Sequence, residues 1–220
     1  MWDNETVLML TENAGITLYM TLVSTLMAYV IGLPAGIALV LHAPDGLKPN
    51  RVIYKILDFI VNVTRSVPFL ILLILIIPLT RMIAGKSYGA TATIVPLTFA
   101  AAPFIARLVE SSVREVDPGV IEAALSMGAS TWQIVRKVLL TEARTSLIVG
   151  VTIALGTILG YSAMSGTVGG GGLGDIAIRY GYYRYEAGIM WVTVILLVVL
   201  VQILQASGTR IAKKIDKRSR

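Results

Sequence analysis

The sequence predicts an all-α, polytopic integral membrane protein with five spanning helices in a single domain, residues 1–220. Three observations predict this class. Charged residues make up only 15% of the chain, whereas an average soluble domain carries roughly 25%. Apolar runs of about 20 residues, the length a helix needs to cross a bilayer, recur along the chain. Lys and Arg gather in alternate segments between these runs.

Five segments are expected to span the membrane: 15–41, 56–80, 87–106, 146–168 and 187–208. The first is longer than the apolar region of about 7–15 residues in a signal peptide, so we expect it to be retained. The second is the weakest, because it contains Asp58 and Arg65 and its uncharged part is short. Either its helix is short or Arg65 lies inside the hydrocarbon layer.

The distribution of basic residues predicts the orientation. Fourteen Lys and Arg residues fall in segments 42–55, 107–145 and the tail after 208, against four in the alternate segments. Basic segments stay on the cytoplasmic side, so the N-terminus is expected outside and the C-terminus in the cytoplasm. Beside a membrane span, the basic tail is interpreted as a contact with anionic lipid rather than with nucleic acid.

The composition excludes several kinds of chemistry. The chain has no cysteine, which excludes disulfides and thiol catalysis, and its only histidine, His42, excludes a multi-histidine metal site within one chain. No complete Walker A sequence occurs, so any ATP that drives the protein has to be hydrolysed by another chain. Residues 169–174 match Gly-x-Gly-x-x-Gly, but no strand precedes them, and a flexible or tightly packed external loop is expected instead. We therefore expect no cofactor and no enzymatic activity.

A polar insert, residues 117–141, interrupts the apolar runs and is predicted to fold as a helix, a turn and a second helix. Asp117 is a suitable N-cap, and Pro118 fits the first helical position. Gly128 is placed to end this helix in the left-handed conformation.

The second helix of the insert begins at Ser130-Thr131-Trp132-Gln133, which matches a capping box, and is expected to run on toward the fourth span. Small side chains on the first, exposed helix suit insertion into a groove of a partner protein. An ordinary amphipathic helix at the membrane surface is the alternative.

The insert also resembles a family motif. Glu122-Ala123-Ala124, three residues, Gly128, nine residues and Val138-Leu139-Leu140 resemble the EAA motif of ABC importer permeases, although Thr141 stands where proline is usual. In that family the motif forms a coupling helix that sits in a cleft of the ATPase subunit. The resemblance thus implies that Glu122, Ala123, Ala124 and Gly128 couple this chain to an ATPase.

Further segments resemble the methionine-importer permease subfamily: 65–69, 94–97, 101–107, 160–164, 169–174 and 180–182. The resemblance implies the type I importer permease fold in a bacterial inner membrane. It implies a homodimer with two ATPase subunits, fed with D- or L-methionine by an extracytoplasmic methionine-binding lipoprotein.

For such a cargo, the outer end of the fourth span is the best candidate for the translocation path: Tyr161, Ser162, Met164 and Ser165. Hydroxyl, thioether and aromatic groups suit a zwitterion with an apolar tail, but tight helix packing explains the small residues equally well. Arg65 is a candidate gate or ATPase contact, unless it only extends to the membrane surface.

Two other functions remain open from the residues. The first is the same kind of importer with another amino acid or a small osmolyte as its cargo. An ion-gradient-driven transporter is disfavoured, because the spans hold only Asp58 and Arg65 as ionisable groups for coupling. A membrane scaffold without transport activity is the third class.

Overall fold

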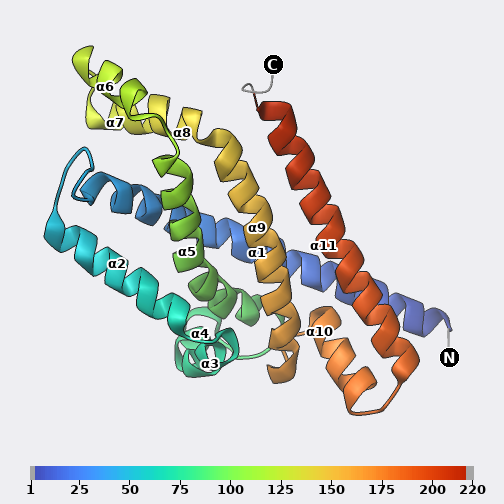
Figure 1. The fold of residues 1–220 in the computed structure, drawn as a ribbon. Coiled ribbons are helices and arrows are strands. Elements are labelled where there is room, and N and C mark those ends of the chain that lie inside the picture. Colours follow the sequence, from blue (N-terminus) through green and yellow to red (C-terminus); the bar gives the residue numbers. More distant parts are fainter. Residues whose placement is uncertain (1–2, 217–220) are drawn as a thin grey trace.

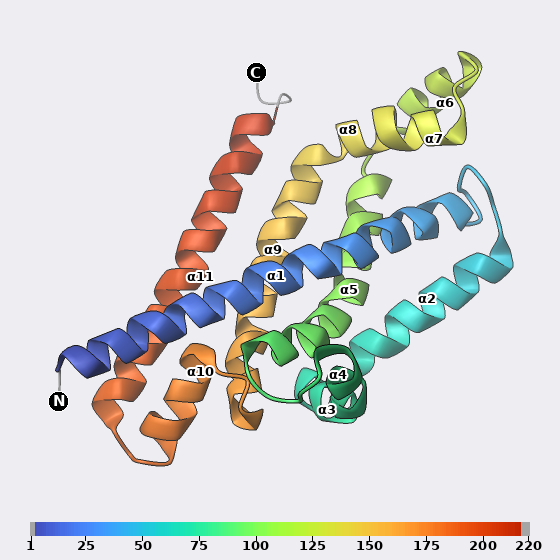
Figure 2. The same cartoon turned by 180° about the vertical axis from the view of Figure 1, so that it is seen from behind.

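The computed structural model describes residues 3–216, which form helices and their connections (Figures 1 and 2). The long helices are α1 (Asn4–His42), α2 (Arg51–Ser66), α5 (Ala90–Arg114), α9 (Arg144–Ser165) and α11 (Ala187–Ile215). The short ones are α3 (Phe69–Leu75), α4 (Ile77–Ala84), α6 (Pro118–Ser126), α7 (Thr131–Gln133), α8 (Leu140–Glu142) and α10 (Gly172–Ile176). The π-helical segments η1 (Ile134–Leu139) and η3 (Ala177–Tyr182) and the 3-10 turn η2 (Gly166–Val168) complete the described chain.

Four helices, α1, α5, α9 and α11, are long and apolar enough to cross a membrane, and α2 with α3 can form a fifth, bent span. This confirms the predicted all-helical membrane fold. Helix α1 begins well before residue 15, because Asp3 caps it by accepting a hydrogen bond from the amide of Thr6 at 2.9 Å. Hydrogen bonding to Thr6 also holds the pKa of the Asp3 carboxyl below its usual value.

The core lies where α1 crosses α5, and small residues allow the two backbones to approach closely. A Cβ atom added to Gly32 would lie 2.7 Å from the carbonyl oxygen of Ala102, and one added to Gly36 would lie 2.5 Å from that of Ala106. Such close approach is typical of helix pairs in lipid, where packing replaces the hydrophobic driving force.

The segment 56–80 is not one straight helix. Helices α2 and α3 meet at an angle of 104°. Val67, which precedes Pro68, has the extended conformation that a residue before proline prefers, and this ends α2. Helix α4 follows α3 after Ile76, so the predicted span consists of three pieces.

The two ends of the bundle carry different parts. Helices α6 to α8 and the C-terminal end of α11 lie at one end, and the N-terminal end of α1 lies with α10 at the other (Figures 1 and 2). The polar insert is therefore grouped with the basic tail, as the distribution of charge would require.

Candidate docking and translocation sites

The first helix of the insert, α6, has the predicted caps. Asp117 accepts a hydrogen bond from the amide of Gly119 at 2.7 Å, and Pro118 is the first helical residue. Gly128 has a φ of 79°. Its amide donates a hydrogen bond to the carbonyl oxygen of Leu125 at 2.9 Å, and the amide of Ala129 donates one to the carbonyl oxygen of Ala124 at 3.0 Å. These two bonds form a Schellman motif, so local groups define both ends of α6.

The second helix of the insert starts as predicted but does not continue as one α-helix. The amide of Ser130 donates to Oε1 of Gln133 at 2.8 Å, and the amide of Gln133 donates to Oγ of Ser130 at 3.4 Å, which closes the capping box. The helix then becomes π-helical over η1 and ends after α8. At Ala143 the chain turns into α9 (Figure 1), so the expected continuous run into the fourth span is interrupted.

The insert presents exposed apolar side chains that the chain itself does not cover. Met127 is 81% exposed and Trp132 69%, and Val120 and Leu125 are also exposed. Glu122 is exposed as well and forms no ion pair with any residue between 3 and 216. Of the other motif residues, Ala123 is exposed, whereas Ala124 is buried against the core. An exposed apolar surface on a rigid, capped helix is suited to docking.

Two hollows lie beside the insert. One of about 460 Å³ lies behind α6, between Leu47 of the α1–α2 loop and Leu125, with Asp45, Arg114 and Glu122 at its edge.

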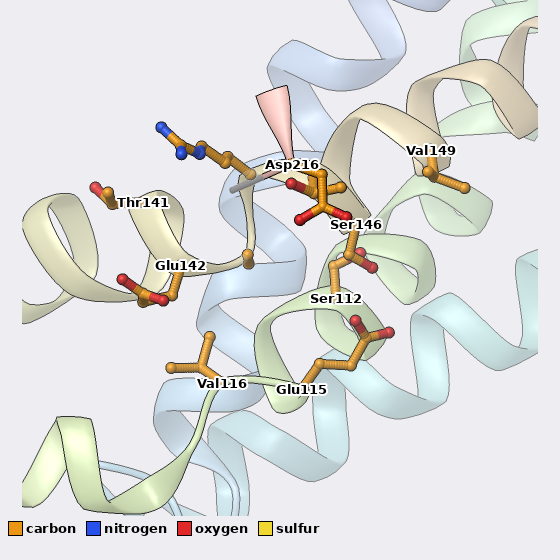
Figure 3. A pocket seen from close by; sticks show the side chains of 11 residues that line it. Ser112, Glu115, Val116, Thr141, Glu142, Ser146, Val149 and Asp216 are labelled. Carbon is orange, nitrogen blue, oxygen red and sulfur yellow. The ribbon is translucent and has the colours of Figure 1, made fainter. Parts of the chain in front are cut away.

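The other hollow, of about 470 Å³, lies at the bend between α8 and α9, beside the end of α11 (Figure 3). Carboxylates from three separate segments line it: Glu115, Glu142 and Asp216. The sequence did not predict either hollow, because each is lined by segments that are far apart in the chain.

A network of charged groups joins α2 to α5. Arg107 is paired with Asp58, with Oε2 of Glu110 at 2.6 Å and with Oδ1 of Asn62 at 2.9 Å. Arg114 extends the network to Glu110 and to Asp45 at 3.0 Å.

Sequence reasoning missed this network because Arg107 was assigned to a connecting segment, whereas α5 continues to Arg114. The available signal was the spacing of the charged and polar residues along the chain. Asp58 and Asn62 are four residues apart on one helix face, and Arg107 and Glu110 are three residues apart on another. Arg65 is exposed at the end of α2 and has no ion-pair partner among residues 3–216.

The four candidate path residues on α9 divide into two groups. Ser162 and Ser165 are buried, and their hydroxyl groups donate to backbone carbonyls of their own helix, at 2.8 Å to Leu159 and 2.6 Å to Ser162. Met164 is half exposed and Tyr161 partly exposed. In this conformation the chain itself encloses Ser162 and Ser165, whereas Tyr161 and Met164 remain accessible.

Tyr161 has a partner that sequence reasoning did not find. Its ring stacks on that of Phe69, the first residue of α3, with centroids 4.6 Å apart and planes 6° from parallel. Phe69 is buried and Pro68 turns it toward α9, so the bend between α2 and α3 brings this pair together.

The glycine-rich segment 169–174 is tightly packed, one of the two structures that the sequence predicted. The amide of Gly170 donates to the carbonyl oxygen of Ser165 at 3.0 Å, and the amide of Leu173 donates to Oγ1 of Thr17 at 2.9 Å.

Residues 85–87 read Gly-Lys-Ser, the end of a Walker A sequence, but Thr80 stands in place of its first glycine and α4 precedes it. Neither segment has the strand–turn–helix setting of a nucleotide site.

The fold and the polar insert together define a class: a helical membrane protein that presents a capped helix with exposed apolar side chains at one end of its bundle. The chain belongs to the family of binding-protein-dependent transport system inner membrane components, whose model matches residues 28–217. It is therefore a multi-pass protein of an inner-membrane family.

Individual relatives agree with this family. The probable D-methionine transport system permease protein MetI of Vibrio cholerae is 51% identical over 202 residues, covering 92% of this chain and 90% of the relative. The D-methionine transport system permease protein MetI of Escherichia coli is 52% identical over 150 residues, covering 68% of this chain and 69% of the relative. Among solved structures, a chain of the MetNI methionine ABC transporter in an inward-facing conformation matches with a TM-score of 0.97 and 47% identity. That match covers 98% of this chain and 100% of the other.

Proposed function

We propose that this chain is the transmembrane subunit of an ATP-driven importer that carries D- and L-methionine across the bacterial inner membrane. The observation that carries the mechanism is α6, a rigid, capped helix with exposed apolar side chains at the end of the bundle where basic residues gather. The cargo is supported by relatives that are named for D-methionine transport and resemble the chain over most of its length.

The working assembly contains two copies of this chain, two ATPase subunits and an extracytoplasmic methionine-binding lipoprotein. Each chain has one docking insert, so two copies present two docking helices to a pair of ATPases. The match to a chain of a methionine ABC transporter supports this composition. The N-terminus lies outside and the C-terminus in the cytoplasm, which the distribution of basic residues supports.

Glu122, Ala123, Ala124 and Gly128 couple the chain to the ATPase. Glu122 offers a charge in the first half of α6 that no residue from 3 to 216 pairs with, and Ala123 allows close approach of a partner's backbone. Gly128 turns the chain so that Met127 and Trp132 are both exposed beside α6.

Uptake by the reconstituted assembly tests the proposed function. Proteoliposomes that contain the chain, its co-purifying ATPase and the binding protein should accumulate methionine when ATP is supplied to the ATPase side. A proton gradient alone should not support uptake. Uptake driven by a gradient without ATP, or purification of the chain without any ATPase, would contradict the proposal.

A pair of glycine variants tests the docking assignment. Gly128 and Gly85 both end a helix in the left-handed conformation, with φ of 79° and 73°, and neither has a heavy atom within 4 Å of an added Cβ. Aspartate at either position therefore adds similar backbone strain. Gly128→Asp should lower ATP-dependent uptake at least about tenfold, because burial of an unpaired charge at an interface costs several kcal/mol. Gly85→Asp should retain uptake, and equal losses from both variants would refute docking at Gly128.

A further inference from the structure

Helix α2 has three distinct faces. The first packs against α1 and α5 through Tyr54, Leu57 and Val61. The second is apolar and exposed, with side chains that are 39–67% accessible: Val52, Ile53, Ile56, Phe59, Ile60 and Val63. The third, which we call the polar face of α2, carries Arg51, Lys55, Asp58, Asn62 and Arg65, spaced three or four residues apart. A helix with three such faces contacts the rest of the protein on one side, an apolar environment on the second and a polar environment on the third.

The polar face reaches far along the helix. At 1.5 Å per residue, Asn62 lies about 16 Å and Arg65 about 21 Å along the axis from Arg51. Arg51 and Lys55 can extend to the membrane surface at the basic end of the bundle. Arg65 lies about 21 Å further along the axis than Arg51, and it is exposed and has no ion-pair partner within residues 3–216.

Lipid is an unsuitable environment for this face. A charged side chain in the centre of a spanning helix costs about 2.5–3.5 kcal/mol on insertion scales, and such residues therefore face protein or a water-filled cavity. Protein satisfies only part of the polar face, because Asp58 and Asn62 bond Arg107 of α5 while Arg65 is left exposed. The exposed apolar face of the same helix is the one suited to lipid or to another apolar surface.

The inner end of the polar face lies close to the candidate path. Arg65 precedes the bend at Pro68 by less than one turn, and Phe69, just after the bend, stacks on Tyr161. An amino acid that passes Tyr161 toward the basic end would next meet a guanidinium group and then the amide of Asn62. Arg65 is available for a carboxylate, whereas Arg107 is already held by Asp58 and Glu110.

We propose that the polar face of α2, together with Arg107, lines a water-filled exit vestibule open toward the docking insert, and that Arg65 at its inner end meets the carboxylate of the transported amino acid. The identity of the cargo rests on the proposed function. Water in the vestibule follows from the distribution of polar side chains on α2 and does not depend on the cargo.

The absence of native cysteine allows a direct test of water access. Single cysteines are placed on the polar face, as Asn62→Cys and, four residues further along that face, as Ser66→Cys. Two more are placed on the apolar face, as Ile60→Cys and Val63→Cys. All four positions are exposed in the isolated chain. A charged methanethiosulfonate reagent is then added to the ATPase side of proteoliposomes that contain the assembled transporter. Thiolate, the reactive form, exists only where water reaches, so both polar-face cysteines should react at least about tenfold faster. Equal rates on the two faces, or faster reaction on the apolar face, would overturn the vestibule.

Two substitutions of Arg65 test its contact with the carboxylate. Arg65→Gln should lower methionine uptake at least about tenfold, and Arg65→Lys, which keeps the cation, should restore most of it. Co-purification of the ATPase serves as the control for assembly and should be unchanged in both. Normal uptake by Arg65→Gln, or equal loss in both variants, would refute the role of Arg65. Failure of the unsubstituted chain to take up methionine would instead refute the proposed function and leave the labelling result valid.

Discussion

The docking insert, α6 to α8, and the bent segment, α2 to α4, are held in shape by contacts of very different range. In the insert, Gln133 closes the capping box on Ser130 three residues away, and Gly128 bonds Leu125. In the bent segment, Asp58 lies 49 residues from its partner Arg107 on α5, and Phe69 stacks on Tyr161 from α9.

This difference predicts how each segment responds when a neighbouring helix or a partner protein moves. The helix ends of the insert are defined by its own caps, so we expect the insert to keep its shape when a partner moves it. The bent segment keeps its shape through α5 and α9, so a shift of either helix changes the bend. Three substitutions test this contrast, from the largest expected effect to the smallest.

Arg107→Met should have the largest effect, a loss of about 3 kcal/mol in the free energy of unfolding, because it leaves the carboxylates of Glu110 and Asp58 without their shared partner. The side chain of Glu110 is only 9% exposed. Unfolding of the purified chain in mixed micelles, followed by circular dichroism, measures the change. Lys48→Met is the control, since Lys48 is exposed and forms no ion pair within the described chain. Similar losses for both variants would mean that the network does not hold α2 to α5.

Phe69→Leu should have an intermediate effect, about 1.5 kcal/mol, because it removes the stacked ring while it keeps a buried apolar side chain. Spin labels on α3 and α9 should report a broader distance distribution across the lost contact. Phe99→Leu is the control, because Phe99 is 42% exposed and is in no stacked pair with another described residue. An unchanged distribution in Phe69→Leu would show that Pro68 alone holds the bend.

Gly128→Ala should have the smallest and most local effect. No atom lies within 4 Å of the added Cβ, so the cost is the left-handed backbone conformation alone, about 1 kcal/mol. Gly128→Asn should cost less, since asparagine tolerates that conformation. Hydrogen exchange should show faster exchange of α6 amides and unchanged exchange in α2. A change that spreads to α2 would contradict the independence of the insert.

The predictable parts of the fold are those with short-range causes. Asp117, Gly128 and the Ser130–Gln133 capping box were all predicted, because a cap involves groups within a few residues of one another. The interruption of the second helix at η1 was not predicted, since no local breaker marks it. Of the candidate path residues, sequence spacing placed Ser162 and Ser165 on one face but did not indicate which face turns inward.

Composition and apolar run length determined that this chain is a helical membrane protein, since a bilayer accepts only segments of sufficient length and apolarity. Short-range capping rules determined the shape of the docking helix. Only the tertiary structure decided that Asp58 pairs with Arg107, that Phe69 meets Tyr161, and which face of α2 stays polar and uncovered. These outcomes depend on how distant helices pack, and the free energies that select one packing arise from contacts that do not exist until the helices meet.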